Sequence, residues 1–265
     1  MSENRARDFF GDELRRKRKA AGLTGKELAD ALGCTPQWVS TLENGRKASE
    51  QSAHDLDTFF KTDGLFHRMW ELAMEIEIQT VVPPGFTEYV GYEKRADRIR
   101  IFSTNLVSGL FQTDAYARTI ISAIMGSDAA RLVTERMERK SIFDRDDPPH
   151  TFLVLDESVI HRNVGGAEVM REQLDYLLEA AQHPRMELQI VPYTAGYHAG
   201  LTGSFIVLGF EDAPEVAYTE SSGEGMLLRQ PDRVALQAVT WDLIQCHTLP
   251  SRESLAMIRD AMEQL

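Results

Sequence analysis

Cysteine is scarce in this chain, and neither its cysteines nor its histidines form a familiar ligand motif. The 265 residues include two cysteines, Cys34 and Cys246, and no Cys-x-x-Cys pattern. This excludes a disulfide framework and a cysteine zinc site, so we expect a cytoplasmic protein. The seven histidines lie at least eleven residues apart, which excludes paired histidine ligands within one short motif. We therefore expect no metal site.

The chain also lacks long apolar runs and the short motifs of common enzymes. No run approaches the roughly 18 apolar residues that a membrane helix requires, and the first ten residues contain no apolar signal region. GxSxG, GxxxxGK[ST] and GxGxxG are all absent, so neither a nucleophile elbow nor a phosphate-binding loop is indicated. We expect no enzyme, no cofactor and no membrane partner.

Charge is distributed unevenly along the sequence. The formal net charge is −12, which argues against a protein that binds nucleic acid over its whole surface. Of the 29 basic and 41 acidic residues, ten and seven lie within residues 1–47, a balance of +3. The remaining 19 basic and 34 acidic residues give the rest of the chain a balance of −15. This asymmetry predicts that only the N-terminal part binds a polyanion such as nucleic acid.

Five helices are predicted in the N-terminal part. Their apolar spacing places them over residues 10–21, 25–32, 36–43, 50–60 and 65–78. Thr24 is suited to cap the second helix, with Glu27 completing a capping box. Thr35 is suited to cap the third helix, which opens with Pro36, and Gly33 supplies the turn between these two helices. The pattern predicts an all-α domain over residues 1–80 that contains a helix-turn-helix.

The third helix is predicted to face DNA. A helix fits the major groove, and the side chains free to meet base edges are those of Pro36, Gln37, Ser40 and Thr41. Gln37 can pair with adenine through two hydrogen bonds, and Thr41 can offer its hydroxyl or its methyl group. Backbone phosphates are expected at the start of this helix and beyond its end, on Thr35, Arg46 and Lys47.

The segment GLTGKELADALGCTPQWVSTLENGRK resembles the helix-turn-helix of Cro/C1-type phage repressors, the XRE family. The hallmark of that family runs G-L-T-Q-x-x-L-A, then S-x-x-T/V-S-x-L-E-N-G. The resemblance implies sequence-specific binding of operator DNA by a five-helix domain. In the family an arginine late in the first helix pairs with the glutamate of L-E-N-G, and Arg18 and Glu43 occupy those positions. We therefore expect a partly buried ion pair between them.

Two departures from the family's sequence pattern predict weaker binding to the DNA backbone. Gly25 replaces the usual phosphate-binding glutamine, and Ala48-Ser49-Glu50-Gln51 stands where some relatives carry a minor-groove arginine. Trp38 can pack against the following helix or stack on a sugar, and the first is preferred. The complete set of expected DNA-binding residues is Thr24, Lys26, Thr35, Pro36, Gln37, Trp38, Ser40, Thr41, Asn44, Arg46 and Lys47.

Residues 85–265 are predicted to form a second, mixed α and β domain with a small sheet, because Val82-Pro83-Pro84-Gly85 cannot continue a helix. Residues 98–102 alternate as an edge strand would. Further strands are indicated at 151–155, 186–192, 204–210 and 215–219. Helices are indicated at 114–125, 128–145, 168–182, 231–247 and 251–264, with Arg136, Arg139 and Lys140 on a charged face of the second.

A discontinuous site in this domain stays possible, and its first candidates are Asp156, Glu157, His161 and His198. The preferred interpretation is structural, since a carboxylate after a buried strand can stabilise the start of a short helix. The loop over residues 192–203 is long for a compact domain, and such loops are commonly functional. Its Tyr193, Tyr197 and His198 are candidate contacts for a protein partner.

The second domain also resembles a known family. The segments YVGYEKRA (residues 89–96), LVSGLFQTDAYAR (residues 106–118) and GYHAG (residues 196–200) carry the likeness. They are similar to the uncharacterised domain that follows a Cro/C1-type head in many actinobacterial regulators. Ser108 replaces the family's usual proline and Lys140 its usual glutamine. The resemblance implies a transcription regulator, often accompanied by a very small protein encoded by a neighbouring gene.

The sequence thus predicts an α+β protein that regulates transcription by binding an operator, as a homodimer on double-stranded DNA. Its C-terminal domain is expected to bind a small protein partner or a signal. An alternative is an antitoxin-like interaction module that regulates its own gene through its head. An enzyme with a DNA-targeting head is a third possibility.

Overall fold

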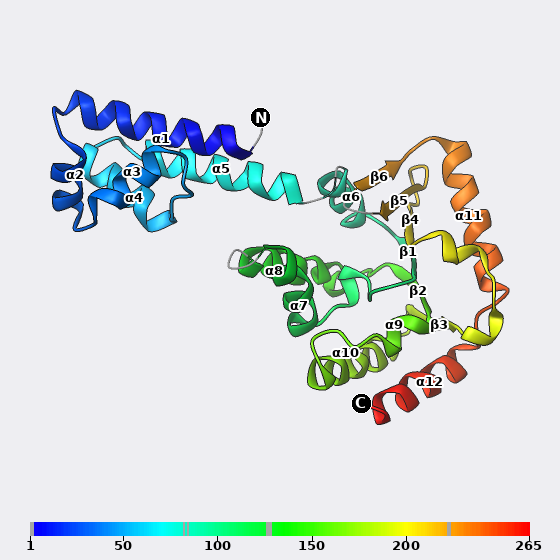
Figure 1. The fold of residues 1–265 in the computed structure, drawn as a ribbon. Coiled ribbons are helices and arrows are strands. Elements are labelled where there is room, and N and C mark those ends of the chain that lie inside the picture. Colours follow the sequence, from blue (N-terminus) through cyan, green and yellow to red (C-terminus); the bar gives the residue numbers. More distant parts are fainter. Residues whose placement is uncertain (1–2, 82, 84, 126–128, 222–223) are drawn as a thin grey trace. The chain divides into compact units, whose positions relative to one another are not determined.

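The chain forms two compact units, each with its own core. The computed structural model describes residues 3–81, 83, 85–125, 129–221 and 224–265. The units are Met1–Val82 and Pro83–Leu265. Helices build the first unit and a mixed sheet with helices builds the second, so the expected α+β class is confirmed (Figure 1). None of the described helices is long and apolar enough to cross a bilayer.

The first unit is all-α in its described residues. Its helices are α1 (Glu3–Ala20), α2 (Gly25–Leu32), α3 (Pro36–Glu43), α4 (Glu50–Phe60) and α5 (Leu65–Val81). Helix α1 begins about two turns earlier than the sequence pattern indicated, and Ala6 within this extension adds one turn to the buried stripe of Phe10 and Leu14. These side chains pack with Leu28, Leu42, Leu56 and Phe66 in one core.

The second unit alternates strands with helices. Its main elements are α6 (Phe86–Glu93), β1 (Arg98–Ser103), α7 (Asp114–Met125), α8 (Ala129–Glu138), β2 (His150–Asp156), α9 (Glu157–His161), α10 (Ala167–Ala180), β3 (Met186–Val191), β4 (Phe205–Gly209), β5 (Val216–Ser221), β6 (Glu224–Leu228), α11 (Pro231–Gln245) and α12 (Ser251–Glu263). Short 3₁₀ helices are η1 (Gly109–Phe111), η3 (Arg139–Asp144), η4 (Tyr193–Ala195) and η5 (Ala199–Thr202). Helix α6 and strand β6 were not indicated by the sequence.

The strands pair in the order β3-β2-β1-β4-β5-β6. Strands β1, β2 and β3 are parallel, whereas β4 runs antiparallel to β1 and the last pairs are also antiparallel. The prediction of an edge strand at residues 98–102 was therefore wrong, since β1 lies at the centre of the sheet. Its alternation arises because Arg98 and Arg100 lie on a solvent-accessible part of one face, where both approach Glu215. Alternation of polar and apolar residues indicates that one face of a strand is accessible to solvent. It does not distinguish an edge strand from a central strand of the sheet.

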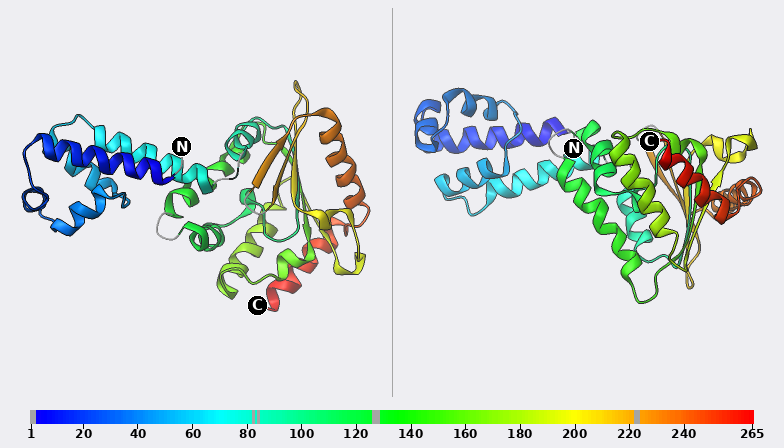
Figure 2. Two further views of the ribbon diagram at one scale, coloured as in Figure 1. Left: turned by 45° about the horizontal axis from the view of Figure 1, so that its top comes forward. Right: turned by 90° about the horizontal axis from the view of Figure 1, so that it is seen from below.

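Helices cover both faces of the sheet (Figures 1 and 2). On one face Ile99, Ile101 and their neighbours pack against α6, α7, α9, α10 and α12. On the other face Phe102 and Val207 pack against Trp241 and Ile244 of α11. In both figures α11 lies on the opposite side of the sheet from α7, α8 and α10.

The charged helix expected over residues 128–145 is instead α8 followed by η3, and Arg139 is buried within it. Residue 128 itself lies outside the described residues. The Nε and Nη2 atoms of Arg139 donate to the Glu93 carboxylate at 2.8 and 2.7 Å, and the Tyr89 hydroxyl donates to the same group. The expected charged face was wrong for Arg139, because a buried carboxylate on α6 draws it inward.

Candidate nucleic-acid interface

The turn between α2 and α3 is fixed by local hydrogen bonds. The Oγ1 atom of Thr24 accepts from the Glu27 N–H at 3.2 Å, and the Glu27 carboxylate accepts the Thr24 N–H at 2.8 Å. The bonds formed by Thr24 lower the pKa of Glu27. Gly33 ends α2 with φ 67°, a left-handed conformation that glycine adopts without strain. Thr35 then caps α3, with its Oγ1 accepting from the Trp38 N–H at 3.2 Å.

Helix α3 is seated by its apolar side and by a close contact with α1. Val39 and Leu42 are buried in the core, as the sequence pattern predicted. A Cβ atom on Gly11 of α1 would lie 2.6 Å from the Leu42 carbonyl oxygen and 2.9 Å from that of Glu43. Only glycine lets α1 approach the end of α3 this closely. The polar side of α3 is therefore held at a fixed angle to the domain.

An ion pair joins α1 to the end of α3. The Arg18 Nε atom donates to Glu43 Oε1 at 2.6 Å and its Nη2 atom donates to Oε2 at 3.0 Å. The Glu43 side chain is only 8% exposed. Burial alone would raise the pKa of Glu43, but the hydrogen bonds and charges of Arg18 and Arg15 outweigh it, so the pKa is lowered. The structure thus has the partly buried ion pair that the resemblance implied, and two hydrogen bonds make the pair bidentate.

Arg15 is a further part of this contact that sequence reasoning missed. Its Nη2 atom donates to the Glu43 carbonyl oxygen at 2.8 Å and to Asn44 Oδ1 at 3.0 Å. The Asn44 amide nitrogen donates in turn to the Ser40 carbonyl oxygen at 2.8 Å. Asn44, expected to contact DNA, therefore has its side chain engaged in closing α3. Arg15 lies three residues before Arg18 and therefore on the same side of α1. This spacing is the sequence signal from which its contact with Glu43 could have been predicted.

The outward side of α3 carries the residues expected to read bases. Pro36, Gln37 and Ser40 are exposed, and the side chains of Gln37 and Ser40 make no hydrogen bond within the described residues. Thr41 is half-buried, and its hydroxyl donates to the Trp38 carbonyl oxygen at 2.9 Å. Its methyl group is the part left for a base, because the hydroxyl is already engaged.

The residues expected to bind phosphates lie around this side. The Thr35 oxygen accepts from Trp38, which leaves its hydroxyl hydrogen to donate. Arg46 is exposed and follows α3, while Lys47 beside it is half-buried. Lys26 and Thr24 are exposed at the start of α2. Lys26 and Arg46 are therefore exposed cations that can donate to backbone phosphates, whereas the Thr24 hydroxyl already donates to the Glu27 carboxylate at 2.8 Å.

Trp38 and Cys34 have mainly structural surroundings. Both are partly buried and pack against the apolar core of the first unit. Burial raises the pKa of the Cys34 thiol, which disfavours the reactive thiolate. The preferred interpretation of Trp38 as a packing residue agrees with its contacts.

In the second unit, the carboxyl ends of the parallel strands bring together Asp156, Glu157 and His198. Asp156 Oδ1 accepts from the Ser158 N–H at 2.9 Å, the helix cap that was preferred for it. Asp156 Oδ2 lies 3.3 Å from His198 Nε2. The Glu157 carboxylate accepts the Tyr193 N–H at 2.6 Å and lies 3.5 Å from the fourth candidate, His161. Both carboxylates thus hold the loop over residues 192–203 against the sheet.

This loop presents two tyrosines and hides its histidine. Tyr193 is 58% exposed and Tyr197 is 80% exposed. His198 is buried at 3%, where Asp156 and the Phe102 ring hold it inward. Of the three candidate partner contacts, the tyrosines are accessible, whereas His198 is positioned to support the loop.

The geometry of the first unit is that of a DNA-binding helix-turn-helix, and comparison with protein families supports this. A helix-turn-helix domain model matches residues 10–65. A second model, described as a domain of unknown function (DUF5753), matches residues 86–260, more than half of the chain. The chain belongs to this family, and its domain order is that of a helix-turn-helix regulator with an uncharacterised C-terminal domain. No curated protein matches the sequence.

Proposed function

We propose that the chain is a sequence-specific transcription regulator of the Cro/C1 type that binds operator DNA in the cytoplasm. The observation that carries the proposal is the outward side of α3, where Gln37 and Ser40 are exposed and unengaged. Helix α3 is held by the Gly11 contact and by the Arg18–Glu43 pair. A rigid helix with free polar side chains is suited to direct readout in the major groove.

Selection of bound sequences from random double-stranded DNA tests the base-reading assignment. The unmodified chain is expected to select one operator motif. Gln37→Ala should lower affinity for that motif by about 1–3 kcal/mol and relax the preference at one base pair. Arg46→Ala should weaken motif and random DNA alike and reduce the salt slope by about one. Equal losses on motif and random DNA for both variants would contradict base reading by Gln37.

The regulator is proposed to act as a homodimer, and the outer side of α11 supports this. Leu236, Val239 and Leu243 are 63%, 54% and 53% exposed. Their spacing places them on one side of the helix, while Trp241 and Ile244 face the sheet. An exposed apolar stripe of this kind marks an interaction surface.

A second copy of the chain is the occupant that fits this stripe best. If two α11 helices pack antiparallel about a twofold axis, Leu236 of one copy meets Leu243 of the other. The same packing brings the Val239 side chains of the two copies close to the twofold axis, so each copy covers the exposed apolar stripe of the other.

The C-terminal unit is further proposed to bind a small protein partner through Tyr193 and Tyr197. Exposed tyrosines bury a large area at low entropic cost, which suits an interface. The antitoxin-like function remains the second candidate, because it would use the same surface. Co-expression with the products of neighbouring genes separates the two, since only an antitoxin restores the growth of cells that produce a toxic partner.

Tyr193→Ser with Tyr197→Ser should abolish capture of such a partner. The melting temperature should remain unchanged, because both rings are exposed. Capture that survives the double substitution would contradict the assignment of this loop.

A further inference from the structure

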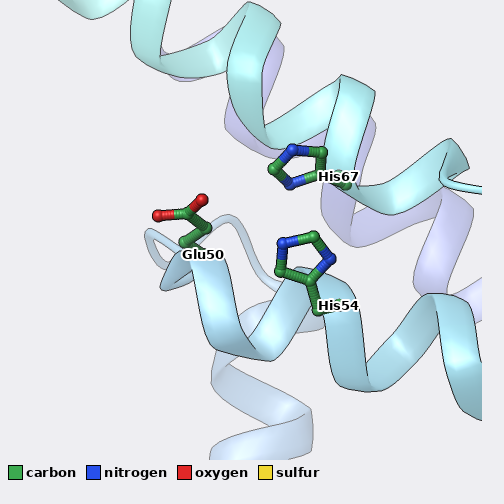
Figure 3. A group of neighbouring side chains, drawn as sticks. All are labelled: Glu50, His54 and His67. Carbon is green, nitrogen blue, oxygen red and sulfur yellow. The ribbon is translucent and has the colours of Figure 1, made fainter.

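A cluster of possible metal ligands lies on α4 and α5 of the first unit. Glu50 and His54 project from α4 and His67 projects from α5 (Figure 3). One carboxylate oxygen and one ring nitrogen from each histidine lie within 4.8 Å of one another. Glu50 and His54 are four residues apart, a spacing that places both side chains on the same side of α4. Packing between α4 and α5 brings the third residue to them.

His67 has one nitrogen that lacks a hydrogen-bond partner. Its Nδ1 atom is buried and makes no hydrogen bond. Its Nε2 atom lies 3.5 Å from Glu71 Oε1, so Nδ1 is the nitrogen left for the cluster. A buried polar atom without a partner is destabilising, and a bound cation would satisfy its lone pair. A metal-binding histidine commonly donates its other N–H to a carboxylate, and Glu71 is placed to accept it.

The surrounding contacts place the two histidines together and leave one of them able to move. The rings of His54 and His67 are stacked, with centroids 4.2 Å apart and planes 20° from parallel, so the exposed His54 ring must turn out of the stack for both nitrogens to point at one ion. The carboxylate of Asp57 accepts the backbone N–H groups of Phe66 and His67, both at 2.8 Å, which fixes the start of α5. Glu50 and His54 are exposed, so rotation of their side chains can close the distance to a metal without moving the backbone.

We propose that Glu50, His54 and Nδ1 of His67 bind one Zn²⁺ ion. Two imidazole nitrogens and a carboxylate oxygen are suitable zinc ligands, with bonds of about 2.0–2.2 Å, and water completes a tetrahedral shell. Glu71 orients His67 from the side remote from the metal. The ion joins the first turn of α4 to the start of α5. Because α4 begins just after Arg46 and Lys47, the ion also fixes the segment proposed to contact phosphates.

The test uses the full chain, stripped of metal by a chelator and dialysed. Titration with Co²⁺ should give the visible absorption of a tetrahedral nitrogen-and-oxygen site at one equivalent per chain, and Zn²⁺ should displace it. Zn²⁺ should raise the melting temperature of the first unit. His54→Gln and Glu50→Gln should each weaken Zn²⁺ binding more than about a hundredfold without changing the melting temperature of the metal-free chain. Glu71→Gln should weaken it by about tenfold to a hundredfold.

His150→Gln is the matched control, because His150 is an exposed histidine of the second unit. It should leave Co²⁺ absorption and Zn²⁺ affinity unchanged. His67→Gln should abolish the absorption, and circular dichroism verifies that this variant is folded. Zn²⁺ binding that is equally strong in His54→Gln, Glu50→Gln and the unmodified chain would overturn the proposal, as would the absence of binding to the unmodified chain.

Discussion

At the scale of single residues, Glu43 concentrates several interactions on one carboxylate. Arg18 binds it through two hydrogen bonds and Arg15 adds a third. Glu43 is buried, so removing it leaves the Arg18 guanidinium without its partner. The cost of stranding one member of a buried pair is about 3–5 kcal/mol, which is a large fraction of the stability of a small domain.

Glu43→Ala should therefore lower the melting temperature of the first unit strongly. Asp30→Ala is the control, because Asp30 is an exposed acid of α2 that forms no ion pair within the described residues. Differential scanning calorimetry of both full-length variants measures the effect. If the two variants melt at the same temperature, the ion pair contributes nothing to stability.

The same carboxylate should make the first unit sensitive to acid. The pKa of Glu43 is lowered from its ordinary value of 4.5, so its contribution is complete above that value and is lost as the pH falls through the lower, folded pKa. The pKa of Asp57 is lowered as well, and it acts in the same direction. Between about pH 5 and about pH 3, the melting temperature of the unmodified chain should fall by more than that of Glu43→Gln. Parallel losses in the two proteins would assign the acid sensitivity to other groups.

At the scale of elements, Asp57 connects two helices. It lies in α4, yet its carboxylate accepts from the Thr62 hydroxyl at 2.5 Å and from two backbone N–H groups at the start of α5. The first N–H groups of a helix have no partner within the helix, so a side chain from the preceding helix can cap it.

Asp57→Ala should cost about 0.5–2 kcal/mol of stability, the usual loss for a helix cap. It should also speed hydrogen exchange in the first turn of α5 more than elsewhere in the unit. The exposed Asp55 on the same helix provides the control, because among the described residues its side chain bonds only to Gln51. Uniform exchange across α5 in the Asp57 variant would exclude a capping role.

Local signals in the sequence predicted most of the helix boundaries. Thr24, Gly33 and Thr35 act through hydrogen bonds or φ angles within a few residues, so their roles were readable without tertiary contacts. The centre of the sheet was not readable in this way. The neighbours of β1 are β2 and β4, which come from distant parts of the chain, and an alternating pattern is the same for central and edge strands.

The candidate site residues also differ in whether local signals or distant contacts determine their positions. Gln37 and Ser40 were predicted because they lie on one helix with a known apolar side. The inward position of His198 depends on Asp156, which comes from a strand 42 residues earlier. The Glu50, His54 and His67 cluster was also missed, because α4 must pack against α5 before its histidines become neighbours.

At the scale of the whole molecule, the stripe on α11 predicts the oligomeric state. Leu236→Lys with Leu243→Lys places four like charges within the proposed twofold contact, so the protein should become monomeric. Light scattering after size-exclusion chromatography measures the mass. Met226→Lys is the control, because Met226 is an exposed apolar residue of β6. A dimer that persists in the double variant would exclude α11 as the interface.

The central position of β1 sets an order of events during synthesis. The helices of the first unit need only contacts within the first 82 residues, so this unit can fold while the ribosome is still producing the sheet. Strand β1 cannot be enclosed until β4 has emerged, more than 100 residues later. A chain that terminates before β4 would carry a folded head joined to an open strand edge and an uncovered apolar face. Such a product is expected to aggregate through the sheet residues while retaining a folded helix-turn-helix.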